Sequence, residues 1–85
     1  MKPYTVVWPK SVLNDLTTLW LESTERDKMT HSAEQLHRWL STRPEKSREE
    51  REGLRRLVAP PLQILFHISE PDRLVQVDAV KLAEH

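Results

Sequence analysis

The 85-residue sequence has no cysteine and only one glycine, Gly53. The absence of cysteine excludes disulfide bonds, thiol catalysis and zinc sites with cysteine ligands. It is also compatible with a reducing cytoplasm, which is where we expect the protein to act. A single glycine makes a glycine-rich phosphate-binding loop impossible.

Long apolar segments and an excess of charge are also missing. No run approaches the 18 apolar residues of a membrane span, and the opening apolar run is too short for a secretion signal, so we expect no membrane partner. The 13 basic residues balance the 13 acidic ones, so any binding of nucleic acid needs a local basic patch. We expect one domain, residues 1–85, with a small core that is only modestly stable or needs a partner.

The first quarter of the chain is predicted to form a strand and a helix. Residues 4–8 are β-branched and aromatic, which predicts a short strand that ends at Pro9. Apolar residues at helical spacing then predict an amphipathic helix over residues 10 to about 23. Trp20 falls on the side of this helix that we expect to face the core.

A second amphipathic helix is predicted to follow. Thr24 and Asp27 have the spacing of a capping box, which would start this helix. Pro44 ends it, because the residue before a proline avoids the helical region. One apolar face is formed by Met29, Ala33, Leu36 and Leu40. Two such helices joined by a short turn indicate a helical hairpin.

The second half of the chain carries the remaining apolar runs. Residues 45–52 are almost all charged and predict a solvated loop or a frayed helix end. Three runs follow, over residues 54–58, 62–68 and 74–82, separated by proline-containing turns. They predict a three-stranded meander. The fold class is therefore α+β in the order β-α-α-β-β-β, with a two-helix hairpin packed on a small, mainly antiparallel sheet.

Three segments together suggest a family. They are the opening "YTVVWPKSVLNDLTTLWLES", the charged "SREEREGLRRL" and the closing "PPLQILFHISEPDRLVQVDAVKL". In this order they resemble the RelE/ParE family of toxins from type II toxin–antitoxin systems, over nearly the whole chain. The resemblance implies a growth-inhibiting toxin and a cognate antitoxin protein that covers its basic surface in a toxin–antitoxin hetero-oligomer.

The resemblance leaves the mechanism open. RelE-like members resemble ribonucleases that cleave mRNA in the ribosome, and we lean to this translation-inhibiting activity, with the ribosome and mRNA as partners. ParE-like members resemble inhibitors of DNA gyrase that have no hydrolytic site. A third alternative is a degenerate module that only binds its antitoxin. None of these needs a cofactor, and no cluster of residues has the spacing of metal ligands.

RNA cleavage through the 2′-hydroxyl needs a base, a cation that stabilises the charge on phosphate, and an acid. The resemblance implies that Arg56 occupies a basic catalytic position, and that Lys81 and His85 are further catalytic candidates. Gln63 stands where RelE-type enzymes carry an arginine, which favours the gyrase alternative.

Further candidates for binding RNA or a partner are Arg48, Arg51, Arg55, Trp39 and Arg73. Strand alternation sends Arg55 to the face opposite that of Arg56. Each candidate also has a structural interpretation: the charged tract can pair with itself in solvent, Arg73 can pair with Asp72 or Glu70 in the turn, and tryptophans more often belong to a core. Alternation places His67 opposite Phe66, and we favour a structural histidine there over a general base.

Overall fold

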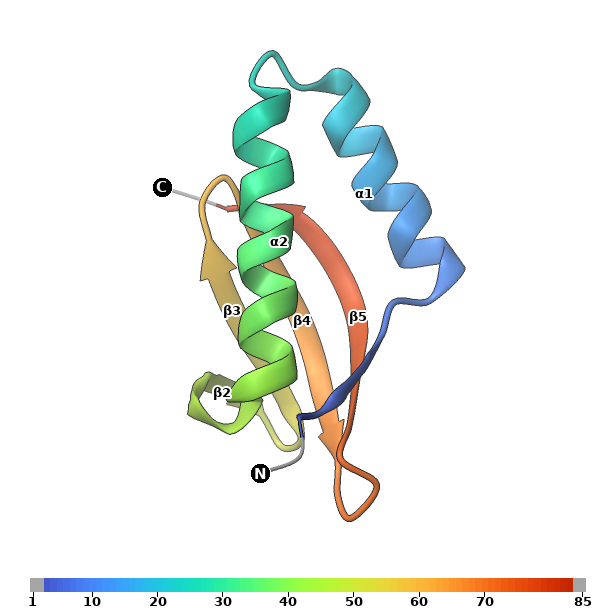
Figure 1. The fold of residues 1–85 in the computed structure, drawn as a ribbon, viewed down its shortest axis with the longest axis vertical. Helices are drawn as coiled ribbons and strands as arrows, with labels where there is room; N and C mark the ends of the chain where they lie inside the picture. The colour runs from blue at the N-terminus through green and yellow to red at the C-terminus, as the bar shows by residue number, and fades with distance from the viewer. Residues whose placement is uncertain (1–2, 84–85) are drawn as a thin grey trace.

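The computed structural model describes residues 3–83, in which two helices cover one face of a five-stranded sheet (Figure 1). This confirms the predicted α+β class and the helical hairpin. The elements in chain order are β1 Thr5–Val7, α1 Lys10–Glu22, α2 Arg26–Thr42, the short 3₁₀ helix η1 Pro44–Lys46, β2 Arg48–Arg51, β3 Leu54–Ala59, β4 Leu62–Ser69 and β5 Leu74–Leu82.

The strand order is β1-β5-β4-β3-β2. β3, β4 and β5 form the predicted antiparallel meander, and β2 adds antiparallel to β3. β1 pairs in parallel with β5, so the first strand closes the edge formed by the last one. The sheet is therefore mainly antiparallel, as predicted.

The prediction of a loop or frayed helix over residues 45–52 is wrong. This tract forms η1 and the edge strand β2, which turns into β3 at Gly53. Gly53 has a φ of 79°, which glycine adopts without steric cost, and its N–H donates to Oε2 of Glu49 at 3.1 Å. All four residues of β2 are exposed, so the strand lacks the apolar alternation that would have predicted it.

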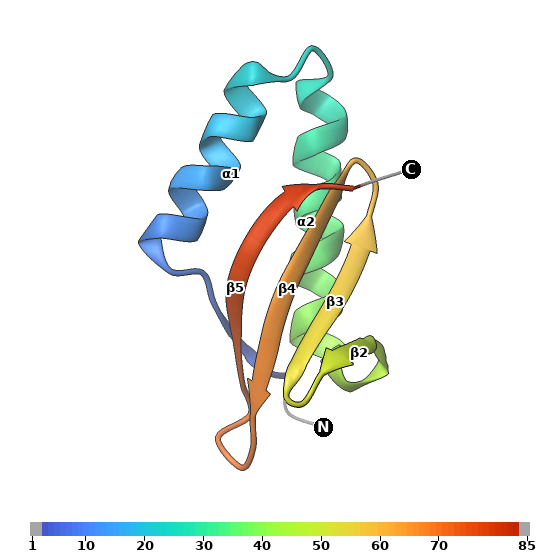
Figure 2. The same cartoon turned by 180° about the vertical axis from the view of Figure 1, so that it is seen from behind.

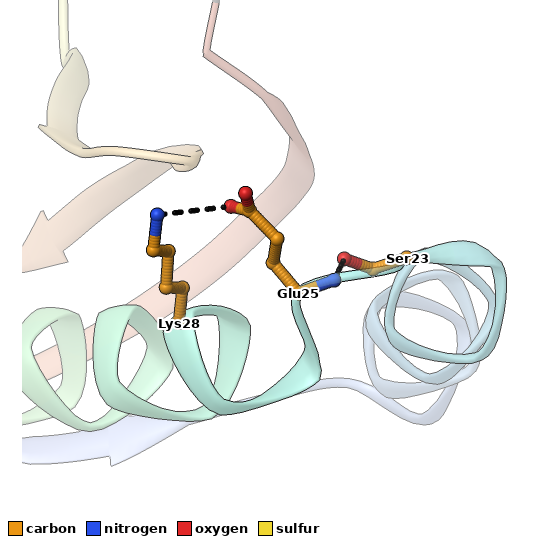
Figure 3. Close-up of polar contacts among 3 residues, drawn as sticks. All are labelled: Ser23, Glu25 and Lys28. Carbon is orange, nitrogen blue, oxygen red and sulfur yellow. Dashed lines mark hydrogen bonds and ion pairs between the residues drawn. The ribbon is translucent and has the colours of Figure 1, made fainter.

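The predicted capping box is also wrong, because α2 begins at Arg26 and Thr24 lies in the connection before it. In that connection Oγ of Ser23 accepts the backbone N–H of Glu25 at 2.9 Å, and the Glu25 carboxylate lies 3.3 Å from Nζ of Lys28 (Figure 3). The guanidinium of Arg26 reaches back to the carbonyl of Leu21. α2 has no side-chain cap, and these contacts hold the turn at its start.

The core lies between the sheet and the helices. Its buried residues are Tyr4, Val12, Met29, Leu36, Leu40, Leu62, Ile64, Phe66, Val75, Val77 and Val80. Ser32 of α2 is buried with them and donates to the carbonyl of Ala59, which ties this helix to the end of β3. Trp20 is not a core residue, contrary to the prediction: it is exposed, and its indole N–H donates to Oγ1 of Thr30 at 3.0 Å, between the two helices.

Candidate functional site

The face of the sheet opposite the helices is uncovered (Figure 2), and we call it the open face. The register of the strands decides which residues it presents. Arg55 pairs with Phe66, which is buried beneath the helices, whereas Arg56 pairs with Leu65. Because cross-strand partners point to the same side of a sheet, Arg56 lies on the open face and Arg55 on the helix side.

Two arginines stand directly opposite each other on the open face. Arg48 of β2 is the cross-strand partner of Arg56 of β3. Like charges in this arrangement destabilise a sheet. Glu50 relieves part of the repulsion, because its carboxylate lies 3.0 Å from Nε of Arg56. Glu50 reaches Arg56 from the part of β2 where the register shifts between Glu49 and Arg51.

Lys81 is a third cation of the open face. It pairs with Gln63 of β4. Arg56 is in register with Leu65 and Ala79, so Lys81 lies two residues along the strands from that row. From the spacing of strands and residues, the Cα atoms of Lys81 and Arg56 are roughly 12 Å apart. Gln63 itself is buried, and its amide donates to the carbonyl of Leu82 at 2.9 Å. The position at which the resemblance implied an arginine therefore has a structural hydrogen bond.

His67 and Asp78 form a pair on the same face. Nδ1 of His67 in β4 lies 2.9 Å from Oδ2 of Asp78 in β5. Asp78 is the extra residue of a β-bulge, since Leu65 pairs with Ala79 while the next residue, Phe66, pairs with Val77. Sequence reasoning placed His67 on the correct face but missed this partner, because no residue pattern marked the bulge.

The remaining predicted site residues lie elsewhere or are used in other contacts. Arg55 donates to the carbonyl of Ser47 at 2.8 Å and to that of Glu45, which fixes the end of η1. Arg51 is exposed opposite Leu54. Trp39 is half-buried, with the guanidinium of Arg43 5.3 Å from the centroid of its ring system. His85 lies outside the described residues.

Arg73 takes part in a cluster that joins β1 to the turn between β4 and β5. Its guanidinium lies over the ring of Tyr4, 4.1 Å from the centroid, and its own φ is 52°. The hydroxyl of Tyr4 donates to Oε1 of Glu70 at 2.9 Å. This hydrogen bond, assisted by burial, raises the pKa of the Tyr4 phenol above its ordinary value of 10.0.

A second surface feature is a groove between α1 and α2, with a volume of about 690 Å³ and a mostly apolar lining. Trp8 and Trp20 border it, and the indole N–H of Trp8 donates to Nδ1 of His37 at 3.2 Å. Leu13, on the α1 side, is 45% exposed. Such an exposed apolar surface on a small protein is typical of a binding site for another protein.

Residues 3–83 contain no group of three or more side chains placed to hold a metal ion. Within the same residues, no helix is long and apolar enough to cross a membrane. Among the described residues, the open face presents the cations Arg48, Arg56 and Lys81, the carboxylates of Glu50 and Asp78, and the imidazole of His67.

Two solved structures share this fold over nearly the whole chain. A chain of the toxin–antitoxin complex RelBE2 from Mycobacterium tuberculosis is 21% identical and superimposes with a TM-score of 0.77, over 98% of this chain and 94% of that one. The isolated RelE toxin of E. coli is 18% identical, with a TM-score of 0.61 over 96% of this chain and 86% of that one. No protein-family model and no curated protein matches the sequence. The chain thus has the fold of RelE toxins.

Proposed function

We propose that this protein is the toxin of a type II toxin–antitoxin system and that it inhibits translation by cleaving mRNA on the ribosome. The fold shared with RelE toxins over nearly the full chain supports the toxin role. The observation that carries the activity is the pair of arginines, Arg48 and Arg56, set directly opposite each other on the open face.

This pair is suited to a phosphate group. Two guanidinium groups held together on a sheet repel each other, and an anion between them removes that repulsion. The chain has no net charge, so the electrostatic field of the whole protein does not attract RNA. The local concentration of cations on the open face would do so instead. Lys81 extends the cationic surface along β5 and gives a second contact to the RNA backbone.

In the cleavage reaction the 2′-oxygen attacks the adjacent phosphorus, and negative charge develops on the phosphate oxygens. Arg56 is the group that stabilises this charge, since it lies on the open face with Arg48 beside it. Lys81 and the terminal His85 are the other catalytic candidates from the sequence. Arg51 adds a charge at the edge strand, where RNA would enter the face.

A cognate antitoxin is the protein partner that we propose, in a hetero-oligomer with the toxin. It would have to neutralise the open face, which requires an acidic segment, and to cover the apolar groove between α1 and α2. Trp39 and Arg73 remain candidates for contacts with it. The cytoplasm is the location that this function requires, because the substrate is mRNA on translating ribosomes.

One observation favours inhibition of DNA gyrase by contact alone. Gln63 is buried and its amide is bonded to the carbonyl of Leu82, so this position supplies no cation. A gyrase inhibitor needs no catalytic cation there. In that case Arg56 and Lys81 would be dispensable, and inhibition would depend on exposed contacts of the helices.

The test is inducible expression without antitoxin, with pulse labelling of protein and DNA synthesis and mapping of mRNA 5′ ends. We expect protein synthesis to stop first and new 5′ ends to appear within codons. Arg56→Ala should abolish both effects, whereas Arg38→Ala, which removes an exposed arginine from α2, should not. An early stop of DNA synthesis that persists in Arg56→Ala would establish the gyrase alternative. No inhibition of either kind would identify a binding module.

A further inference from the structure

We infer that His67 is the general base of the RNA cleavage and that Asp78 is the residue that positions it; this inference rests on the proposed function. The two side chains meet on the open face, with Nδ1 of His67 2.9 Å from Oδ2 of Asp78. Neither residue belongs to the basic set that the family resemblance implies.

The hydrogen bond fixes the tautomer of the ring. An ionised carboxylate only accepts hydrogen bonds, so the neutral imidazole must carry its proton on Nδ1. Nε2 is then left with the lone pair, as in catalytic histidines that a carboxylate orients. The side chain of His67 is 43% exposed, so a substrate can reach the ring.

The bulge in β5 supports a functional role for the pair. Asp78 is the residue by which β5 exceeds β4 in the paired segment, and bulges commonly redirect a side chain beside an active site. A purely structural role explains the pair less well. Its side chains are 43% and 31% exposed, and ion pairs this accessible contribute little to folding stability.

His67 also lies at the right separation from Arg56. Leu65 is the cross-strand partner of Arg56, and His67 is two residues further along β4 on the same face. Diagonal neighbours of this kind have Cα atoms roughly 7–8 Å apart. The 2′-hydroxyl and the phosphate of one nucleotide are adjacent groups, so an imidazole can reach the first while a guanidinium holds the second.

The reaction then balances within the RNA. Nε2 of His67 takes the proton of the 2′-hydroxyl, and the 2′-oxygen forms a bond to phosphorus while the bond from phosphorus to the 5′-oxygen breaks. The proton passes through solvent to the departing 5′-oxygen. The products are a 2′,3′-cyclic phosphate and a 5′-hydroxyl, and no metal or oxidant is needed.

The test is single-turnover cleavage of mRNA by the purified full chain on programmed ribosomes. His67→Asn keeps an amide N–H near the position of Nδ1 but has no base, and it should be slower by about 100-fold or more. Asp78→Asn should also be slower, because the Nδ1 proton loses its carboxylate acceptor and the ring loses its orientation. His31→Gln, a change of an exposed histidine on α2, is the matched control and should retain the wild-type rate.

Three further readouts separate catalysis from structure. The wild-type rate should rise with pH, as general-base catalysis requires, and this rise should be lost in both His67→Asn and His67→Gln. The charged side chains that face His67 from the two flanking strands are Asp78 of β5 and Arg56 of β3. Arg51 lies one strand further out, on β2. Free imidazole should restore part of the rate of His67→Ala. Ribosome binding of each variant, measured by co-sedimentation, should equal that of the wild type.

The outcomes distinguish the two proposals. If both His67→Asn and His67→Gln cleaved mRNA at the wild-type rate, the assignment of the base would be overturned while the nuclease function stayed intact. The assignment would also be overturned if imidazole did not restore the rate of His67→Ala and if the slower His67→Asn and His67→Gln kept the pH dependence of the wild type. A wild-type protein that binds ribosomes without cleaving mRNA would overturn the proposed function and this assignment together.

Discussion

Replacement of Glu50 by Gln should weaken the fold and strengthen anion binding at the same time. Glu50 lies 3.0 Å from Arg56, and the two side chains are 27% and 39% exposed. An ion pair of this accessibility contributes about 0.5 kcal/mol, and the exposed repulsion between Arg48 and Arg56 costs a similar amount. Because the repulsion between Arg48 and Arg56 is present in the wild type as well, Glu50→Gln should lower the free energy of unfolding by about 0.5 kcal/mol, the value of the lost ion pair, which lowers the Tm of a domain of this size by about 2–4 °C.

The assay is thermal denaturation with millimolar sulfate and with chloride at equal ionic strength. Sulfate should raise the Tm of Glu50→Gln more than that of the wild type, because the anion takes the place of the lost carboxylate between the two arginines. Glu52→Gln, an exposed change with the same effect on net charge, should show neither the lower Tm nor the larger response. If the two variants behave alike, Arg48 and Arg56 do not form an anion site.

Three further changes test the fold. Phe66→Ala should destabilise by about 3–5 kcal/mol in urea denaturation, because Phe66 is fully buried, whereas Leu21→Ala, at a 55% exposed position, should change stability by less than about 0.5 kcal/mol. Gly53→Ala should cost about 1–2 kcal/mol, because its φ of 79° is strained for a residue with a Cβ although the space around it is open. The hydrogen bond to Glu70 raises the pKa of the Tyr4 phenol, so it favours folding only while the phenol is protonated. The free energy of unfolding of the wild type should therefore fall as the pH rises above 10, and Tyr4→Phe should not show this fall.

The elements with an apolar periodicity were predictable. The helices α1 and α2 and the strands of the meander follow runs of apolar residues at helical or strand spacing, and the structure has them at nearly the predicted positions. Strand alternation also placed Arg55 and Arg56 on opposite faces. A period of this kind reports which side of an element meets the core, and that is a local property of the sequence.

The edge strand β2 and the position of Trp20 were not predictable in this way. β2 is exposed along its whole length, and it is a strand only because its backbone bonds to β3. Trp20 has the spacing of a core residue, but α2 supplies a hydrogen-bond partner that holds it at the surface. Each depends on a neighbour that the local pattern does not describe.

Local patterns in the sequence predict the α+β class, the helical hairpin, the meander and the presence of a basic tract. The tertiary structure alone decided which charges meet: Arg48 opposite Arg56, Glu50 beside them, and Asp78 turned towards His67 by a bulge. The physical reason is that the spacing of apolar residues along an element shows which of them are buried. The register between strands is instead set by hydrogen bonds between backbones, and one extra residue in a strand shifts every pair beyond it.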